Sequence, residues 1–215
     1  MAMNFSTEYT IYIKIFVSIL AIVNPLGAIP VFLSLCGDRP VAEARSIAKT
    51  TGISVAVVLL ISAWSGEMIL TFFGIGIPSF RTGGGLLILL MAIAMMHAKQ
   101  SHVKRSPEEE DADNDKEGVA VVPLAIPLLA GPGAISLVVI EGQHMATFTH
   151  HLMISFCILV VAIVVWIVLL LAEPIGKRLG VTGLNISTRI MGLLLVAIGI
   201  QMIADGLVQL FPALG

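Results

Sequence analysis

Six apolar segments occupy most of the chain, and short polar connections separate them. A helix needs about 20 mostly apolar residues to cross the hydrocarbon core of a bilayer. Each of the six is close to that length, and only the connections are rich in charge. The pattern predicts an all-α membrane protein with six transmembrane helices. The predicted spans cover residues 9–36, 50–73, 80–97, 119–141, 151–173 and 189–211.

The longest polar stretch separates the third span from the fourth. It contains Lys104 and Arg105, followed by four consecutive acidic residues at 108–111. Such a stretch cannot bury enough apolar surface to fold alone, so it predicts a linker between two halves of the molecule. We therefore expect a first three-helix repeat at 1–97, a charged cytoplasmic linker at 98–118, and a second three-helix repeat at 119–215.

The two halves repeat one another in sequence. The tripeptide Gly-Ala-Ile occupies 27–29 and again 133–135, 106 residues later, and Glu67 and Glu173 are separated by the same interval. The pattern Arg-x-x-Gly-x-Leu-Leu begins at Arg81 and again at Arg189, 108 residues later. Because three spans is an odd number, the second half would enter the membrane from the opposite side. The chain thus predicts two inverted three-helix repeats.

Helix-breaking residues lie in the middle of the first and fourth spans. Proline removes a backbone donor and frees a carbonyl group, and glycine allows backbone angles that are closed to other residues. Lipid offers no partner for the freed groups, which must be satisfied by protein, water or a ligand. Helices 1 and 4 are therefore predicted to be discontinuous. The breaker residues are Pro25, Gly27 and Pro30 in the first span, and Pro127, Gly131, Pro132 and Gly133 in the fourth.

Two broken helices that cross near the bilayer centre can hold a small zwitterion. The N–H end of a half-helix carries partial positive charge and suits a carboxylate, and the carbonyl end suits an ammonium group or a cation. Asn24 and Ser136 are the nearest polar side chains, and either could instead cap a half-helix or bond to its own backbone. The alternative is that the prolines only kink two packed helices. The predicted substrate-binding residues are Asn24, Pro25, Gly27, Ala28, Gly131, Pro132, Gly133 and Ser136.

Five ionisable residues lie in or beside the spans, where an unpartnered charge is costly. The favoured interpretation is an interfacial pair at each membrane face, Glu67 with Arg81 and Glu173 with Arg189, with gating pairs as the alternative. Asp205 is either a proton or cation carboxylate or an ordinary residue near the headgroups.

Three histidines, His144, His150 and His151, cluster after the fourth span. Their spacing does not match the helical H-E-x-x-H metal motif, so we expect an exposed, pH-sensitive or incidental loop. No metal or cofactor is predicted. The glycines at 83–85 predict close helix packing at the start of the third span.

The charge pattern predicts the orientation in the membrane. Net charge is −2, which gives no footprint for nucleic acid. Most basic residues fall in the connections after the first, third and fifth spans, and such loops stay in the cytoplasm. Both termini are therefore expected outside. These basic residues are Arg39, Arg45, Lys49, Lys99, Lys104, Arg105, Lys116, Lys177 and Arg178.

Three motifs together resemble the MarC family of bacterial inner-membrane proteins. They are Asn-Pro-Leu-Gly at 24–27 running on to Phe32, the stretch 123–136 around Ala-Gly-Pro-Gly-Ala-Ile-Ser, and Arg-Ile-Met-Gly-Leu at 189–193. The resemblance covers essentially the whole chain. It implies a six-span fold with discontinuous first and fourth helices, a multi-pass location in the inner membrane, and kinship with members that carry small neutral amino acids such as glycine and alanine.

The expected function is therefore secondary transport of small neutral amino acids by alternating access. The partners would be a small zwitterionic substrate, the lipid bilayer and a coupling ion, either a proton or sodium; assembly into an oligomer stays open. A passive channel for small solutes or ions is the alternative. An enzyme is not expected, because neither an H-E-x-x-H motif nor a nucleophile–base pattern occurs, and there is no G-x-x-x-x-G-K-[ST] motif for ATP.

Overall fold

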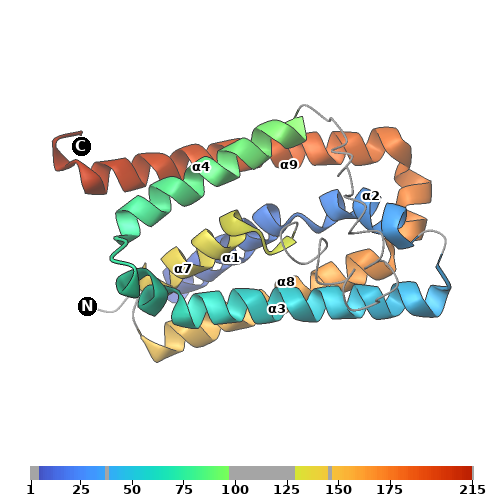
Figure 1. Ribbon diagram of the computed structural model, residues 1–215, viewed down its shortest axis with the longest axis horizontal. Coiled ribbons are helices and arrows are strands. Elements are labelled where there is room, and N and C mark those ends of the chain that lie inside the picture. The colour runs from blue at the N-terminus through green and yellow to red at the C-terminus, as the bar shows by residue number, and fades with distance from the viewer. Residues whose placement is uncertain (1–4, 37–38, 97–128, 145–146, 215) are drawn as a thin grey trace.

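The structure, a computed structural model, describes residues 5–36, 39–96, 129–144 and 147–214 (Figure 1). Every regular element among these residues is helical, as the sequence predicts. The elements are α1 (Phe5–Val23), α2 (Pro25–Cys36), α3 (Val41–Phe72), α4 (Ile77–Met96), α7 (Pro132–His144), α8 (Phe148–Leu170), α9 (Ala172–Leu210) and the short 3₁₀ helix η3 (Pro212–Leu214).

Five segments of the described chain are long and apolar enough to cross a membrane. They agree with the predicted first, second, third, fifth and sixth spans. The predicted fourth span, 119–141, lies partly outside the described residues, and α7 contains its described end. The predicted linker at 98–118 lies wholly outside them. The five segments are Thr10–Cys36, Val41–Phe72, Ile77–Met96, Phe148–Leu170 and Thr182–Leu210.

The helices form three layers (Figure 1). The broken pair α1–α2 and helix α7 lie in the middle, between a layer of α4 and α9 and a layer of α3 and α8. The central helices supply much of the buried core, including Ile19, Ile22, Ile29 and Val138. The outer helices keep large apolar side chains exposed, which suits a surface that faces lipid. Both helix interruptions therefore lie in the middle layer.

Glycines bring α4 and α9 into backbone contact. A Cβ atom added to Gly85 would lie 2.7 Å from the carbonyl oxygen of Gly199, and one added to Gly199 would lie 2.9 Å from that of Gly85. Gly192 meets the carbonyl oxygen of Ala92 in the same way, at 3.1 Å. Without a hydrophobic driving force in lipid, such small residues allow the dense packing that joins membrane helices. The close packing predicted for the glycines at 83–85 is confirmed for Gly84 and Gly85, whereas a Cβ atom on Gly83 would meet no described atom within 4 Å.

Helix α9 contains a sharp change of direction before its membrane span. Gly180 has φ 60° and ψ −179°, which lie outside the helical region. Glycine adopts such a positive φ at little cost because it has no Cβ atom. The first turns of α9 thus run at an angle to the rest, as the orange bend in Figure 1 shows. The span itself begins beyond this bend, at Thr182.

Candidate helix-break site in the membrane core

The first interruption is a single residue, Asn24, between α1 and α2. Its φ of +47° places it in the left-handed region, which asparagine tolerates better than most residues. The backbone N–H of Asn24 still donates to Leu20 at 2.9 Å, so α1 keeps its last hydrogen bond. The side-chain Oδ1 then accepts from the N–H of Gly27 at 3.2 Å. Asn24 is therefore the N-cap of α2, one of the roles expected from the sequence.

The two prolines of the first span have different roles. Pro25 is the first residue of α2, where a missing N–H costs nothing because that group has no intrahelical partner. Pro30 lies inside α2, and the helix continues through it. The helix is therefore broken only at Asn24 and Pro25, and the prediction that Pro30 belongs to the interruption is wrong.

The second interruption precedes α7. Ala130 forms a bend and Gly131 has no regular structure, and α7 begins at Pro132. The N–H of Ile135 donates to Gly131 at 3.1 Å. The N–H groups of Gly133 and Ala134 come before this bond, at the helix end where backbone donors lack intrahelical acceptors. Ala130 and Ala134 are buried, so this helix end lies within the protein.

The two interruptions lie close together. A Cβ atom added to Gly133 would lie 3.6 Å from Cγ2 of Ile22, which is two residues before Asn24. It would lie 2.6 Å from Cγ1 of Ile88 on α4. The start of α7 thus packs against both the end of α1 and the middle of α4.

Helix α4 contacts residues of both interruptions. Nδ2 of Asn24 lies 4.0 Å from the sulfur of Met95. A Cβ atom on Gly84 would lie 2.6 Å from the hydroxyl oxygen of Ser136. Met95 and Gly84 are separated by three helical turns, so α4 connects the two groups of predicted residues along one side.

All eight predicted site residues are described, and they differ in exposure. Most are buried, including Asn24 at 7% and Ser136 at 2% exposed, whereas Gly27 is partly buried and Pro132 is exposed. Asn24 and Gly27 contact each other directly, and Gly133 and Ser136 contact α4. One hollow that the structure describes lies elsewhere, between α3 and α8. At the interruptions, a Cβ atom added to Gly27 or Gly133 would lie less than 3 Å from a neighbouring side chain, so the described packing at these two glycines is close.

The predicted outer pair has other surroundings. The carboxylate of Glu67 accepts a hydrogen bond from Nε2 of Gln143 at 2.9 Å. Arg81 is only 8% exposed, although an interfacial residue that reaches toward the headgroups would be exposed. The expectation that the Arg81 side chain snorkels toward the headgroups is wrong. Asp205 accepts from Gln201 at 2.8 Å, one turn earlier on the same helix.

The predicted inner pair, Glu173 with Arg189, is not formed, because Glu173 pairs with Lys177 instead. Glu173 accepts a hydrogen bond from Lys177 at 2.6 Å, one turn along α9, and Arg189 is exposed. This hydrogen bond, together with the charge of Lys177, lowers the pKa of the Glu173 carboxyl. Both side chains are exposed, so the pair is a surface ion pair of small energetic weight.

His150 is a structural residue that sequence reasoning missed. It lies in the first turn of α8, capped by Thr147, and is only 2% exposed. Its Nε2 is 2.9 Å from the carbonyl oxygen of Glu141, and its Nδ1 is 3.3 Å from the hydroxyl of Tyr12. A neutral ring satisfies both contacts by donating from Nε2 and accepting at Nδ1. The expectation of an exposed loop here is wrong, and the threonine before the apolar run was the available signal.

No group of three metal-binding side chains occurs among the described residues.

Residues 9–211 match the family described as "MarC family integral membrane protein". The chain belongs to the MarC family. It is accordingly an integral, multi-pass membrane protein, in keeping with its five membrane-length segments.

Curated relatives of this MarC family member carry general names. A "UPF0056 membrane protein" of Buchnera aphidicola subsp. Schizaphis graminum is 40% identical over 207 residues, 96% of each chain. "UPF0056 membrane protein YhcE" of Escherichia coli (strain K12) is 38% identical over 207 residues, again 96% of each chain. An archaeal relative, "UPF0056 membrane protein MJ1677" of Methanocaldococcus jannaschii, is 38% identical over 196 residues, 91% of this chain and 95% of the relative. No solved structure matches the chain.

Proposed function

We propose that this MarC family member is a secondary transporter of small neutral amino acids in the bacterial inner membrane. The observation that carries the proposal is the meeting of two helix interruptions inside the protein, with Gly133 of one packed against Ile22 beside the other. Broken helices that meet at mid-membrane are the recurring construction of substrate sites in secondary transporters.

The chemistry of the second interruption favours an anionic group. The N–H groups of Gly133 and Ala134 lie at the N-terminal end of α7, which carries about half a positive charge. Because they are buried, little water competes for them, and a carboxylate there would gain charge-assisted hydrogen bonds. The ammonium group of a zwitterion would then be held by backbone carbonyl groups at the other interruption.

The packing around this point favours a small substrate. Ile22 and Ile88 both lie within 4 Å of where a Cβ atom on Gly133 would be. These apolar side chains leave little room and offer no charge for a long polar side chain. Glycine and alanine fit such surroundings better than larger amino acids.

We also propose that the halves are inverted repeats with a pseudo-two-fold axis in the membrane plane. The interval of 108 residues that relates Arg81 to Arg189 also relates Ile88 to Val196. The contacts between α4 and α9 are disposed symmetrically about that second pair, Gly85 meeting Gly199 on one side and Ala92 meeting Gly192 on the other. A two-fold axis between Ile88 and Val196 would produce this arrangement, which supports alternating access by rocking of one half against the other.

The repeat and the distribution of basic residues both favour the same orientation of the chain in the membrane. We propose that both termini lie outside and that the charged linker at 98–118 lies in the cytoplasm. In this orientation the first turns of α3 and α9, which contain Arg45 and Lys177, lie at the cytoplasmic face.

Uptake into proteoliposomes tests the transport proposal. Purified protein should take up radiolabelled glycine or alanine saturably, and an imposed proton or sodium gradient should drive accumulation above the external concentration. Linear flux that never exceeds the external concentration would instead identify the alternative, a passive channel. Absence of any flux of either amino acid would contradict the proposed substrate class.

A pair of matched variants tests the site. Gly133→Leu would place a side chain against Ile22 and Ile88, whereas a Cβ atom at Gly83 meets no described atom within 4 Å. Gly133→Leu should abolish uptake, and Gly83→Leu should retain it, with both proteins folded as judged by size-exclusion chromatography. Normal uptake by folded Gly133→Leu would show that the site is elsewhere.

A further inference from the structure

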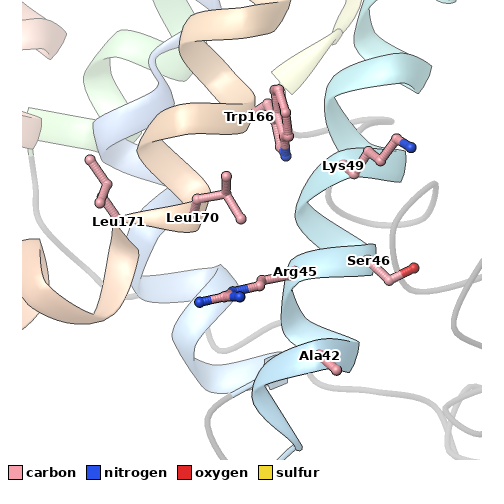
Figure 2. A pocket seen from close by; sticks show the side chains of 7 residues that line it. All are labelled: Ala42, Arg45, Ser46, Lys49, Trp166, Leu170 and Leu171. Atoms are coloured by element: carbon pink, nitrogen blue, oxygen red, sulfur yellow. The ribbon is translucent and has the colours of Figure 1, made fainter.

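A groove of about 550 Å³ opens between the first turns of α3 and the last turns of α8 (Figure 2). It lies at the end of the membrane spans, apart from the helix interruptions. Its walls combine basic, small polar and large apolar side chains. The lining residues are Ala42, Arg45, Ser46 and Lys49 of α3, Trp166 and Leu170 of α8, and Leu171, which follows α8.

The groove is positively charged. Arg45 and Lys49 are one helical turn apart on α3, and both are exposed. None of the seven described lining residues is acidic. The acidic residues nearest in sequence have other partners, because Glu43 pairs with Arg39 at 3.2 Å and Glu173 pairs with Lys177 at 2.6 Å. The two groove cations are thus well placed to meet an anion.

Packing at Gly52 determines where the groove begins. A Cβ atom on Gly52 would lie 3.2 Å from the carbonyl oxygen of Ala162 and 3.1 Å from Cβ of Trp166, so the two helices touch there. Roughly two to three turns nearer the start of α3, the small residues Ser46 and Ala42 leave space. Trp166 closes the upper end of this space, and Arg45 reaches from α3 toward Leu170 below it (Figure 2). Tryptophan is typical of the boundary between hydrocarbon and headgroups.

The groove continues into an apolar surface along both helices. On α3, Ile53, Val57 and Ile61 follow Lys49 at intervals of four residues, and each is about half exposed. The helix face that presents two cations at its end is therefore apolar toward the membrane centre. On α8 the exposed residues Ile163, Leu159 and Phe156 extend away from Trp166 in the same direction. The surface is therefore complementary to an amphiphile: it has a positively charged end, and two apolar tracks formed by the exposed residues of α3 and of α8.

We infer that this groove binds an anionic phospholipid of the leaflet that borders it. The lipid phosphate would lie between Arg45 and Lys49, and its acyl chains would lie along the apolar residues of α3 and α8. Basic pockets between helices are a recurring site for acidic headgroups. A free inorganic anion would use the cations alone, whereas only a lipid uses the charged end and the apolar tracks together. The inference does not depend on what the protein transports.

Native mass spectrometry of the detergent-solubilised protein tests the inference, with dioleoyl phosphatidylglycerol as the probe and dioleoyl phosphatidylcholine as the uncharged comparison. The unmodified protein should bind phosphatidylglycerol more tightly. Neutralising both cations in Arg45→Gln/Lys49→Gln should weaken that binding roughly 30-fold, at about 1 kcal/mol for each cation near the headgroup. The matched control is Lys177→Gln/Arg178→Gln, which removes the same charge from exposed residues of α9 and should change binding less than about twofold.

A second variant separates the groove from its charge. Ser46→Trp fills the space and keeps both cations, so it should also weaken phosphatidylglycerol binding severalfold, even if the doubly neutralised protein folds poorly. Equal loss in the α9 control, undiminished binding by Ser46→Trp, or displacement of the lipid by millimolar inorganic phosphate would each overturn the inference. The first result would mean unspecific charge attraction, and the last would mean a simple anion site.

Discussion

The side chain of Asn24 folds back over Gly27, so that its Oδ1 accepts the N–H of Gly27 at 3.2 Å. Gly27 cannot easily be replaced here, because a Cβ atom at that position would overlap the Asn24 amide. Asn24 is thus both the residue that directly follows α1 and the N-cap of α2. This pair fixes the geometry of the first helix interruption.

The first prediction concerns Asn24 itself. Asn24→Gly keeps access to a positive φ, and because glycine is itself tolerated at an N-cap, losing the side-chain cap should cost only about 0.3 kcal/mol. Asn24→Ala loses the cap at about 1 kcal/mol and also strains the left-handed conformation, which should cost roughly 1 kcal/mol more. Thermal unfolding in detergent should therefore rank the unmodified protein above Asn24→Gly and Asn24→Ala last. An alanine variant as stable as the glycine variant would contradict the assignment of strain at this position.

The second prediction concerns Gly27. Gly27→Ala forces the Asn24 amide away and should destabilise the protein by about 1–3 kcal/mol, the range for overpacking a tight site. The matched control is Gly83→Ala, a helical glycine whose added Cβ meets no described atom within 4 Å. That variant should unfold at or above the original temperature, because alanine favours helix. Equal melting temperatures for the two variants would contradict the close contact.

The third prediction concerns the backbone contact between α4 and α9. Gly85→Ala and Gly199→Ala each introduce a methyl group less than 3 Å from the opposite carbonyl oxygen, so each should cost about 1–3 kcal/mol. Because both act on one contact, the double variant should lose less than the sum of the two single losses. Strict additivity in thermal unfolding would show that the two glycines do not share a contact.

The fourth prediction concerns the buried His150. His150→Phe keeps an aromatic ring but removes the hydrogen bonds to Glu141 and Tyr12, and should destabilise the protein by about 1–3 kcal/mol. His151→Phe is the control, since His151 is more exposed and lies against Trp64 with ring centroids 5.2 Å apart. It should change the unfolding temperature much less. Similar losses for both would contradict the structural role of His150.

The fifth prediction concerns pH and the pair of Glu173 and Lys177. The pKa of Glu173 is lowered by Lys177. Any stabilisation from the pair is therefore present above the ordinary glutamate pKa of about 4.3 and is lost as pH falls through the lowered value. Lys177→Gln should raise the pKa of Glu173 toward its ordinary range, as followed by carboxyl carbon NMR. An unchanged pKa would contradict the ion pair.

The same variant should leave the unfolding temperature at neutral pH unchanged. Both side chains are exposed, and solvent screens their attraction. A clear loss of stability would mean that the pair also fixes the first turns of α9.

Features that depend on composition and local pattern could be predicted from the sequence. The apolar segments predicted five described spans to within a few residues in most cases, and the Asn-Pro-x-Gly motif predicted the interruption of the first. Two spans begin clearly earlier than predicted. The sixth begins at Thr182 rather than at 189, and the second begins at Val41, because α3 extends back through a polar stretch that contains Arg45 and Lys49. A helix can continue beyond the membrane, and hydropathy reports only the part within it.

Features that depend on tertiary neighbours could not be predicted. Pro25 and Pro30 look equivalent in sequence, yet the helix breaks only where Asn24 can adopt a positive φ and cap the next turn. Arg81 appeared interfacial from its position in the span, but packing buries it. His150 appeared exposed because the carbonyl of Glu141 and the hydroxyl of Tyr12, nine and 138 residues away, are brought to it only by the fold.

Where α4 crosses α9, the contact at Gly85 and Gly199 is made by main chain against main chain. No rotamer change at these two positions can widen the crossing, since neither residue has a side chain to turn. Any opening between the two helices there requires one whole helix to move as a rigid body. Tying the two helices together with a short covalent cross-link should consequently arrest such an opening, without altering a single group at the helix interruptions.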